Sequence, residues 1–251
     1  MSKRIVQEAL NHLVDDLRAT HGDNLASVVL YGSAAARHQV ELRSDYNLLI
    51  ALQRITPEDL RVAQAPVREW RRLGHPLPVY FTIGELRDAA DVFPIEFHQM
   101  EKARIVLYGA DPFAGLEFSD VNLRHQTEYE LRSKLLQLRR LYIPASVSAE
   151  RLTGLMADSL SSFAALFRAV LLLSGEEPPV AKPDCVRATV RKLKLDGSPF
   201  ERIFALRASN DADLTEREAN EIFAAYLAQI ERVIEVVDLM AGDAQQQQAR
   251  A

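Results

Sequence analysis

Apolar residues follow two different periods along this 251-residue chain, and the change falls near residue 120. Before that point, short runs rich in branched and aromatic residues alternate with runs of helical period. Strands that alternate with helices are typical of an α/β sheet covered by helices. After that point, apolar residues recur at helical spacing and no strand-like run is found, which indicates an all-helical bundle.

The pattern predicts a series of elements in the first half. An amphipathic helix over 3–20 should lie on the sheet, because its apolar residues recur at helical spacing. The predicted strands are 26–32, 45–52, 78–83, 94–100 and 104–109, with helical runs over 57–74 and 84–91. The residues from 48 to 52 are all apolar, which favours a central strand buried on both faces.

The second half is expected to contain helices only. The predicted helices are one ending before Pro144, one over about 148–174, shorter ones over 184–195 and 198–209, and a long one that begins at Thr215. Thr215 with Glu218 three residues later forms a helix-capping signal. We therefore expect an α/β domain over 1–118, a helical bundle over 119–241 and a disordered polar tail over 242–251.

Composition narrows the class of protein. Hydrophobic residues make up 48% and charged residues 26%, as in ordinary globular proteins. The formal charge of −5 gives no net basic field, so nucleic acid is not favoured as a partner. A single cysteine, Cys185, excludes an internal disulfide, and the charged start of the chain does not resemble a signal peptide. We expect a cytoplasmic protein.

One apolar run raises the question of a membrane. It covers 163–175, but Arg168 interrupts it and it is shorter than the roughly 20 residues that span a bilayer. We interpret it as a buried helix and expect no membrane partner. The oligomeric state stays open, a homodimer included.

The chemistry of the chain is concentrated after the first predicted strand. This strand ends in Tyr31-Gly32-Ser33 and leads into a predicted helix. A phosphate is stabilised at such a helix N-terminus by unpaired N–H groups and by the helix dipole. Gly32 would allow a ligand to approach closely, although Gly-Ser alone is also common in plain tight turns.

The next strand carries two polar residues at its start. Asp45 and Asn47 are two apart, so in a strand they project from the same face at the rim of the sheet. The alternative is that Asp45 only caps the turn into the strand.

Together, Gly32-Ser33 and Asp45-x-Asn47, with apolar strands on both sides, resemble the signature of the DNA polymerase β-like nucleotidyltransferase superfamily. Its usual form is Gly-Ser followed by Asp-x-Asp. The helical second half agrees with bacterial two-domain members of the kanamycin nucleotidyltransferase type. The resemblance implies a nucleotidyltransferase fold with a mixed sheet, and it implies Glu96, on the predicted strand over 94–100, as a third carboxylate.

In that superfamily, clustered carboxylates hold two divalent ions that position a nucleoside triphosphate for transfer of a nucleoside monophosphate to a hydroxyl group. The resemblance thus implies Asp45, Asn47 and Glu96 as ligands of Mg²⁺ or Mn²⁺, Asp45 and Glu96 as the catalytic carboxylates, and Gly32, Ser33 and Arg37 as nucleotide contacts. Here the chain departs from the pattern, because Asn47 offers an amide oxygen without a negative charge. One hard cation can still be bound through oxygen ligands, phosphate and water, while the second has lost a carboxylate.

Two further groups were candidates for a role. His98 would share a strand face with Glu96, although a lone histidine in a strand is more often structural. An acidic residue of the helical half, Glu128 or Glu130, could act as general base toward the acceptor hydroxyl, as in related two-domain enzymes, although such charges usually form solvated pairs.

Three functions follow from these patterns. The first is a nucleotidyltransferase that modifies a small molecule or a protein. The second is a catalytically degenerate module that binds or senses a nucleotide. The third is a helical interaction protein with the α/β half as scaffold, since a fold alone does not establish a function.

Overall fold

The computed structural model describes residues 3–36, 46–89, 91–116, 119–179, 181–208 and 214–248. It divides into two compact units, residues 1–118 and 119–251, each described by itself below. The first unit contains, in chain order, α1 (Lys3–His21), a 3₁₀ turn (Gly22–Asn24), β1 (Leu25–Tyr31), α2 (Ser33–Ala36), β2 (Asn47–Leu52), α3 (Pro57–Val62), α4 (Gln64–Arg72), β3 (Val79–Thr82), α5 (Ile83–Asp88), α6 (Pro94–Lys102) and β4 (Arg104–Gly109).

The sheet of the first unit is mixed, as the sequence predicted. Its strand order is β3-β2-β1-β4, with β1 antiparallel to both β2 and β4 and with β2 parallel to β3. β2 is an inner strand, and five of its six residues are buried. The prediction of a central strand covered on both faces is therefore confirmed.

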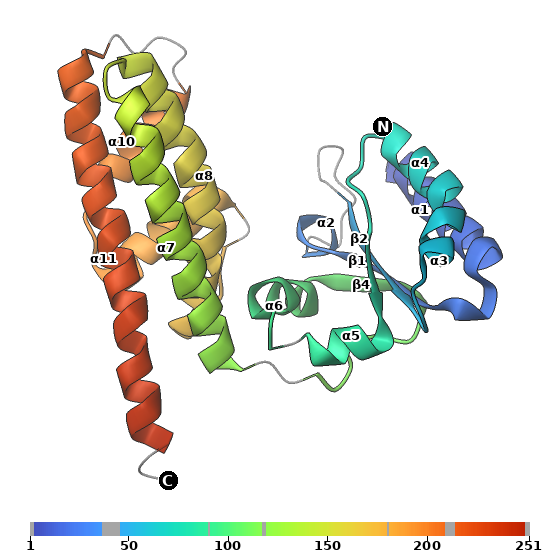
Figure 1. The fold of residues 1–251 in the computed structure, drawn as a ribbon. Coiled ribbons are helices and arrows are strands. Elements are labelled where there is room, and N and C mark those ends of the chain that lie inside the picture. The colour runs from blue at the N-terminus through green and yellow to red at the C-terminus, as the bar shows by residue number, and fades with distance from the viewer. Residues whose placement is uncertain are drawn as a thin grey trace. The chain divides into compact units, whose positions relative to one another are not determined.

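Helices cover both faces of this sheet (Figure 1), and each face has its own hydrophobic core. On one, the α1 face, the strand residues Val28, Leu30, Leu48, Ile50 and Leu52 pack with α1 and with Trp70 of α4. On the other, the α6 face, Val29, Leu49 and Ala51 pack with Leu86 of α5 and with Phe97 and Met100 of α6. The alternation along β1 and β2 follows the period of two expected for a strand.

The second unit contains only helices among its described residues: α7 (Asp120–Ala145), α8 (Ala149–Leu173), α9 (Lys182–Leu193), α10 (Ser198–Ala208) and α11 (Glu216–Gln248). α8 contacts each of the other four. Phe163, Phe167, Phe200 and Tyr226 form an edge-to-face aromatic core with ring centroids 5.8–6.4 Å apart. The Tyr226 hydroxyl, which is fully buried, lies 3.1 Å from Ser159 Oγ.

By length and composition α8 could cross a membrane, and half of its most apolar window is buried in the structure. Because it lies against all four other helices of the unit, it is the central helix of the bundle, as expected for the apolar run over 163–175.

Three predicted boundaries were wrong. The run over 57–74 is two helices, α3 and α4, which meet at Ala63. α7 does not end before Pro144, because proline removes only the bond that its own nitrogen would donate, and Ser146 N–H still reaches Tyr142 O at 2.8 Å. α11 continues to Gln248, so most of the predicted tail over 242–251 is helical.

Candidate functional site

The candidate site lies where β1 ends and β2 begins. Tyr31 is the last residue of β1 and pairs directly with Asn47, the first residue of β2. Residues that face each other across an antiparallel pair project from the same face of the sheet. Tyr31 packs with the α6 core, so Asn47 also belongs to the α6 face.

Gly32 follows Tyr31 and has a conformation that favours glycine, with φ of +84°. Its N–H donates to Ala103 O at 3.0 Å, and its carbonyl accepts from Ala35 N–H at 3.0 Å. A Cβ atom at this position would come within 3.2 Å of Asn47 Nδ2. The missing side chain of Gly32 therefore leaves the space in which the Asn47 amide lies.

The predicted helix after Gly32 is a single turn, α2. Its dipole is correspondingly small, so the phosphate contacts expected here depend on local N–H groups more than on the dipole. The N–H groups of Gly32 and Ala35 already donate to backbone carbonyls. The N–H groups of Ser33 and Ala34 are therefore the candidates for phosphate contacts.

Glu96 of α6 acts electrostatically on Tyr31. Burial and, secondly, the negative charge of Glu96 raise the pKa of the Tyr31 phenol above its ordinary value. Tyr31 therefore keeps its proton at neutral pH, and the Glu96 carboxylate lies within electrostatic range of it. Tyr31, Asn47 and Glu96 form the described part of the candidate site.

Glu96 lies on a helix, so the prediction of a strand over 94–100 was wrong. Ile95 and Phe97 alternate with polar residues, which produced the strand-like pattern. The segment begins with Pro94, which fits the first turn of a helix and disfavours a strand, and Phe97 N–H bonds to Phe93 O at 3.0 Å. Nine residues are too few for apolar spacing to distinguish the two structures.

The same error affects His98. On a helix, residues two apart point in different directions, so Glu96 and His98 do not share a face. His98 is half-buried, whereas Glu96 is exposed. The expected orientation of Glu96 by His98 is therefore lost.

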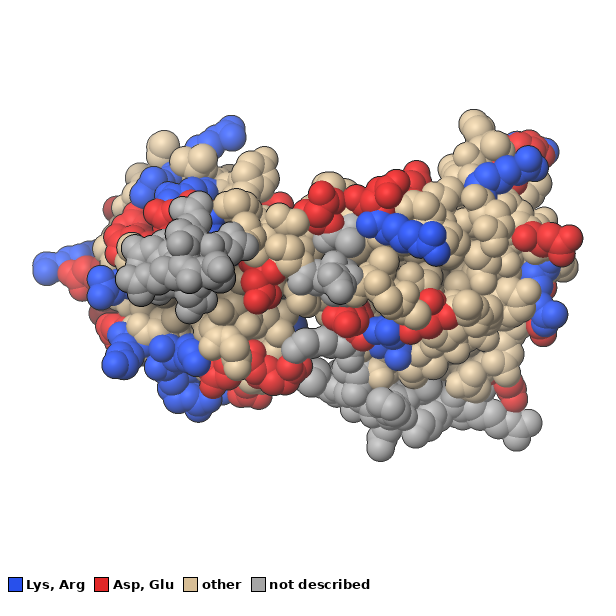
Figure 2. Space-filling view, turned by 90° about the horizontal axis from the view of Figure 1, so that it is seen from below, with Lys and Arg blue, Asp and Glu red and all other residues tan. Residues whose placement is uncertain are grey.

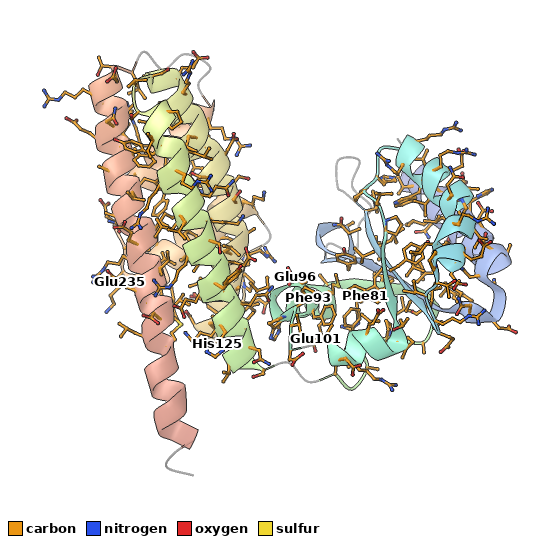
Figure 3. The ribbon with its side chains drawn as sticks, viewed as in Figure 1. Phe81, Phe93, Glu96, Glu101, His125 and Glu235 are labelled. Atoms are coloured by element: carbon orange, nitrogen blue, oxygen red, sulfur yellow. The ribbon has the colours of Figure 1, made fainter. Side chains whose placement is uncertain are left out.

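Aromatic packing holds α6 against the sheet. The Phe97 ring lies 5.9 Å from Phe81 of β3, 6.4 Å from Phe93 and 5.8 Å from Phe113, measured between centroids. Figure 3 shows Glu96 on α6, Phe93 just before this helix, and Phe81. Glu96 immediately precedes the buried Phe97. The packing of Phe97 therefore fixes the position of the Glu96 backbone relative to the sheet.

Arg104 fixes the other end of α6. It is the first residue of β4 and pairs with Tyr31 on the side away from Asn47. Its guanidinium bonds to the carboxylate of Asp111, with Nη2 at 2.7 Å from Oδ2, and donates from Nη1 to the carbonyl of Glu101 near the end of α6. Arg104 also lies over the Phe113 ring, 5.5 Å from its centroid. Arg104 therefore connects the end of α6 to Tyr31 and Asn47, the residues that lie beside it across the sheet.

Sequence reasoning missed Tyr31 and Arg104. The period of two in β1 could have placed Tyr31 on the face of Val29, but nothing in the sequence revealed the register that puts Tyr31 between Asn47 and Arg104.

Two predicted site residues, Arg37 and Asp45, lie outside the described residues. Of Ser33 only the backbone is described. Within the described ranges, no group of three or more His, Cys, Asp or Glu side chains could hold a metal ion. Of the three predicted metal ligands, Asn47 and Glu96 lie among the described residues, and each carries an oxygen atom of the kind that Mg²⁺ accepts.

Glu128 is poorly suited to act as a base. Its carboxylate accepts from Arg132 Nε at 2.7 Å and from Arg124 Nη1 at 2.8 Å. These contacts, led by the Arg132 hydrogen bond, lower the pKa of Glu128. A general base needs a pKa nearer to the working pH, so the geometry indicates a structural role for this residue.

Basic and acidic side chains are interspersed on the face of the molecule seen in Figure 2, rather than gathered into a basic field. Proteins that bind nucleic acid use clustered lysines and arginines to neutralise phosphates. This face therefore lacks the charge pattern of a nucleic-acid surface.

Comparisons with known proteins show the fold. No family model matches the sequence, and no curated protein matches it. Among solved structures, the chain is similar to spectinomycin adenyltransferase AAD(9) from Enterococcus faecialis, solved with ATP and spectinomycin. The TM-score is 0.56 at 13% identity, over 90% of this chain and 98% of that chain. The protein therefore has the fold of the DNA polymerase β-like nucleotidyltransferases, a mixed-sheet domain followed by a helical domain.

Proposed function

We propose that the α/β unit binds a nucleoside triphosphate together with Mg²⁺ or Mn²⁺ and transfers its nucleoside monophosphate to a hydroxyl group of a small molecule or a protein. One observation carries the proposal: Gly32, Tyr31 and Asn47 meet at one end of the sheet, and the charge of Glu96 reaches the same point. The fold shared with an adenyltransferase supports it.

The donors at this point suit one hard divalent cation. The Glu96 carboxylate and the Asn47 amide oxygen would hold it, and phosphate and water would complete an octahedron. Asp45 would join them if the two-residue period of β2 extends one step before Asn47. When bound, the cation would neutralise part of the triphosphate charge and orient the phosphate chain.

The chain's own groups would do the rest. Backbone N–H groups of Ser33 and Ala34 would donate to phosphate oxygens, which Gly32 allows to approach because it has no side chain. The protonated Tyr31 phenol would donate a further hydrogen bond. In the transfer, the acceptor hydroxyl loses its proton to water as its oxygen forms a bond to the α-phosphorus. The bond from that phosphorus to the bridging oxygen breaks, and pyrophosphate leaves.

A second function, nucleotide binding without turnover, is favoured by Asn47. Replacing a carboxylate by an amide removes a negative charge that would reduce repulsion between two ions. A site that holds one ion can bind a triphosphate and still transfer slowly, because orientation alone lowers the barrier by several kcal/mol.

Calorimetry with ATP, GTP, CTP and UTP in Mg²⁺ tests the binding proposal. We expect Glu96→Gln and Asp45→Ala to weaken binding by about tenfold or more, because each removes a charged ligand. Asp88→Asn is the matched control, since it removes an exposed carboxylate from the neighbouring helix α5. Asp88→Asn should leave binding unchanged. Binding that is also unchanged by a chelator, by Glu96→Gln and by Asp45→Ala would contradict both nucleotide functions.

Pyrophosphate release separates the enzyme from the binding module. The measurement uses each nucleotide that binds, with cell extract and with spectinomycin as the first defined acceptor, since the structurally similar enzyme was solved with it. Release that depends on the acceptor and is lost in Glu96→Gln supports transfer. Tight binding without release in any extract supports the binding module.

A further inference from the structure

A hollow lies within the helical unit, between α8, α9 and α10. Its volume is about 430 Å³, which is within the range of pockets that hold small molecules. Every residue that lines it belongs to these three helices, so the hollow does not depend on the nucleotide site or on the proposed function.

Small residues on one face of α8 create the hollow. Ala157, Ser161 and Ala164 are spaced by four and three residues, so they lie on the same side of the helix. The same helix elsewhere carries large buried residues such as Phe163 and Phe167. At the bottom the lining is apolar and deeply buried, with Leu160 and Ile203 each at 2% exposure.

The rim of the hollow is basic. Among the described residues that line it, Lys182, Arg187 and Arg207 are charged and none is acidic. Lys182 and Arg207 differ from Arg187, which is paired with a carboxylate. Lys182 donates to Ser161 Oγ at 3.0 Å, and in the described part of the chain no carboxylate pairs with Lys182 or Arg207.

Arg187 is held in place by its neighbours. Glu201 accepts from Arg187 Nε at 2.7 Å and from Nη2 at 2.9 Å. The guanidinium carbon lies 5.7 Å from the centroid of the Phe204 ring, another lining residue. The ring and the guanidinium held by Glu201 therefore form one wall, while Lys182 and Arg207 supply positive charge that is paired with no carboxylate of the described residues.

We propose that this hollow binds a small amphipathic anion, a molecule whose apolar body fills the space over Leu160 and Ile203 and whose single acidic head lies between Lys182 and Arg207. An apolar body gains free energy by leaving water, and the head gains from charge-assisted hydrogen bonds at the rim. A neutral apolar molecule of the same size would have only the first contribution, and a small inorganic anion only the second.

The probe is 8-anilinonaphthalene-1-sulfonate, an aromatic anion, compared with N-phenyl-1-naphthylamine, which has the same rings without the sulfonate. Titrations use the full chain without nucleotide and follow fluorescence and heat. We expect one sulfonate per chain, at least about tenfold tighter than the neutral amine and weaker at high salt. Equal affinity for the two compounds, or several equivalent sulfonate sites, would overturn the proposal.

Charge variants locate the head. Lys182→Gln with Arg207→Gln should weaken sulfonate binding by about tenfold or more and change binding of the amine by less than about twofold. The control is Arg191→Gln with Arg202→Gln, which removes two exposed charges from the same helices, α9 and α10, outside the hollow. If both double variants bind the sulfonate equally well, the proposal fails.

Space-filling variants locate the body. Ala157→Leu should weaken both compounds by about tenfold, because leucine occupies the hollow, whereas Ala165→Leu on the exposed side of α8 should change neither. Circular dichroism establishes whether each variant is folded. If Ala157→Leu does not fold, the charge variants alone test the proposal. Displacement of the sulfonate by 1-naphthoate or by 1-naphthyl phosphate then assigns the natural head to carboxylates or to phosphate monoesters.

Discussion

The side-chain amide of Asn47 lies close against Gly32, since a Cβ atom added to Gly32 would be 3.2 Å from Asn47 Nδ2. The two residues come from different segments, the end of β1 and the start of β2. Their contact joins the Gly-Ser turn to the position where the superfamily signature has a carboxylate. A substitution of either residue should therefore change the position of the other.

Gly32→Ala should destabilise the protein and weaken nucleotide binding. Its φ of +84° costs a non-glycine residue about 1–2 kcal/mol, and Asn47 must also move. Gly74→Ala is the matched control, because Gly74 has φ of +91° and nothing within 4 Å of an added Cβ. Urea denaturation should show a larger loss for Gly32→Ala than for Gly74→Ala. Equal losses would mean that the contact with Asn47 has no energetic effect.

Asn47→Asp should strengthen binding of a second divalent ion, since it adds the negative charge that the superfamily signature has at this position. Without metal, the same change should raise the pKa of Tyr31 further, because the new charge lies opposite it in the strand pair. Metal titrations in the presence of ATP, followed by calorimetry, measure the first effect, and ultraviolet titration of tyrosine measures the second. Identical metal titrations for the two proteins would argue against a metal near position 47.

The sequence predicted strongly periodic elements well and the site only in part. The buried run of β2 and the helices of the second unit follow from long apolar patterns, and the structure confirms them. The sequence placed Glu96 in a strand, whereas it lies on a helix. Ile95 and Phe97 alternate with polar residues as in a strand, and the packing of Phe97 on the sheet, which stabilises the helix, is not visible in the sequence. The neighbours of Asn47 depend on strand register, which is a property of the folded sheet.

Glu128→Gln should destabilise the helical unit by about 1–3 kcal/mol at pH 7, because it leaves the nearly buried Arg124 without its anion. Glu221→Gln is the control, since Glu221 pairs with Arg217 in the same four-residue spacing but at 63% and 87% exposure. There we expect a change of about 0.5 kcal/mol or less.

The same ion pair predicts a pH dependence. The pKa of Glu128 is lower in the folded protein than its ordinary value, so its contribution is complete above the ordinary value of 4.5 and is lost as pH falls through the lower folded value. Denaturation of the wild type and of Glu128→Gln between pH 7 and 3 should therefore converge at the acidic end. A constant difference over this range would contradict the assignment.

His21 should make stability depend on pH in a higher range. The side chain is buried, and neither of its ring nitrogens has a hydrogen-bond partner among the described residues. The Tyr80 ring lies 6.1 Å away in an edge-to-face arrangement. Burial lowers the pKa of His21, and the nearby Asp59 charge opposes this only in part. The folded protein therefore favours the neutral imidazole.

The direction of the effect follows from proton uptake. As pH falls below the ordinary value of 6.5, the unfolded chain binds a proton at His21 before the folded protein does. The free energy of unfolding should then fall by up to about 1.4 kcal/mol per pH unit, until the lower folded pKa is reached. His21→Leu should remove this slope, whereas His12→Gln should keep it, because the His12 side chain is 79% exposed. Chemical denaturation at pH 7.5, 6.5 and 5.5 measures the three slopes. A His21→Leu slope equal to that of the wild type would contradict the prediction, because it would mean that His21 takes up its proton over the same pH range in the folded and unfolded states.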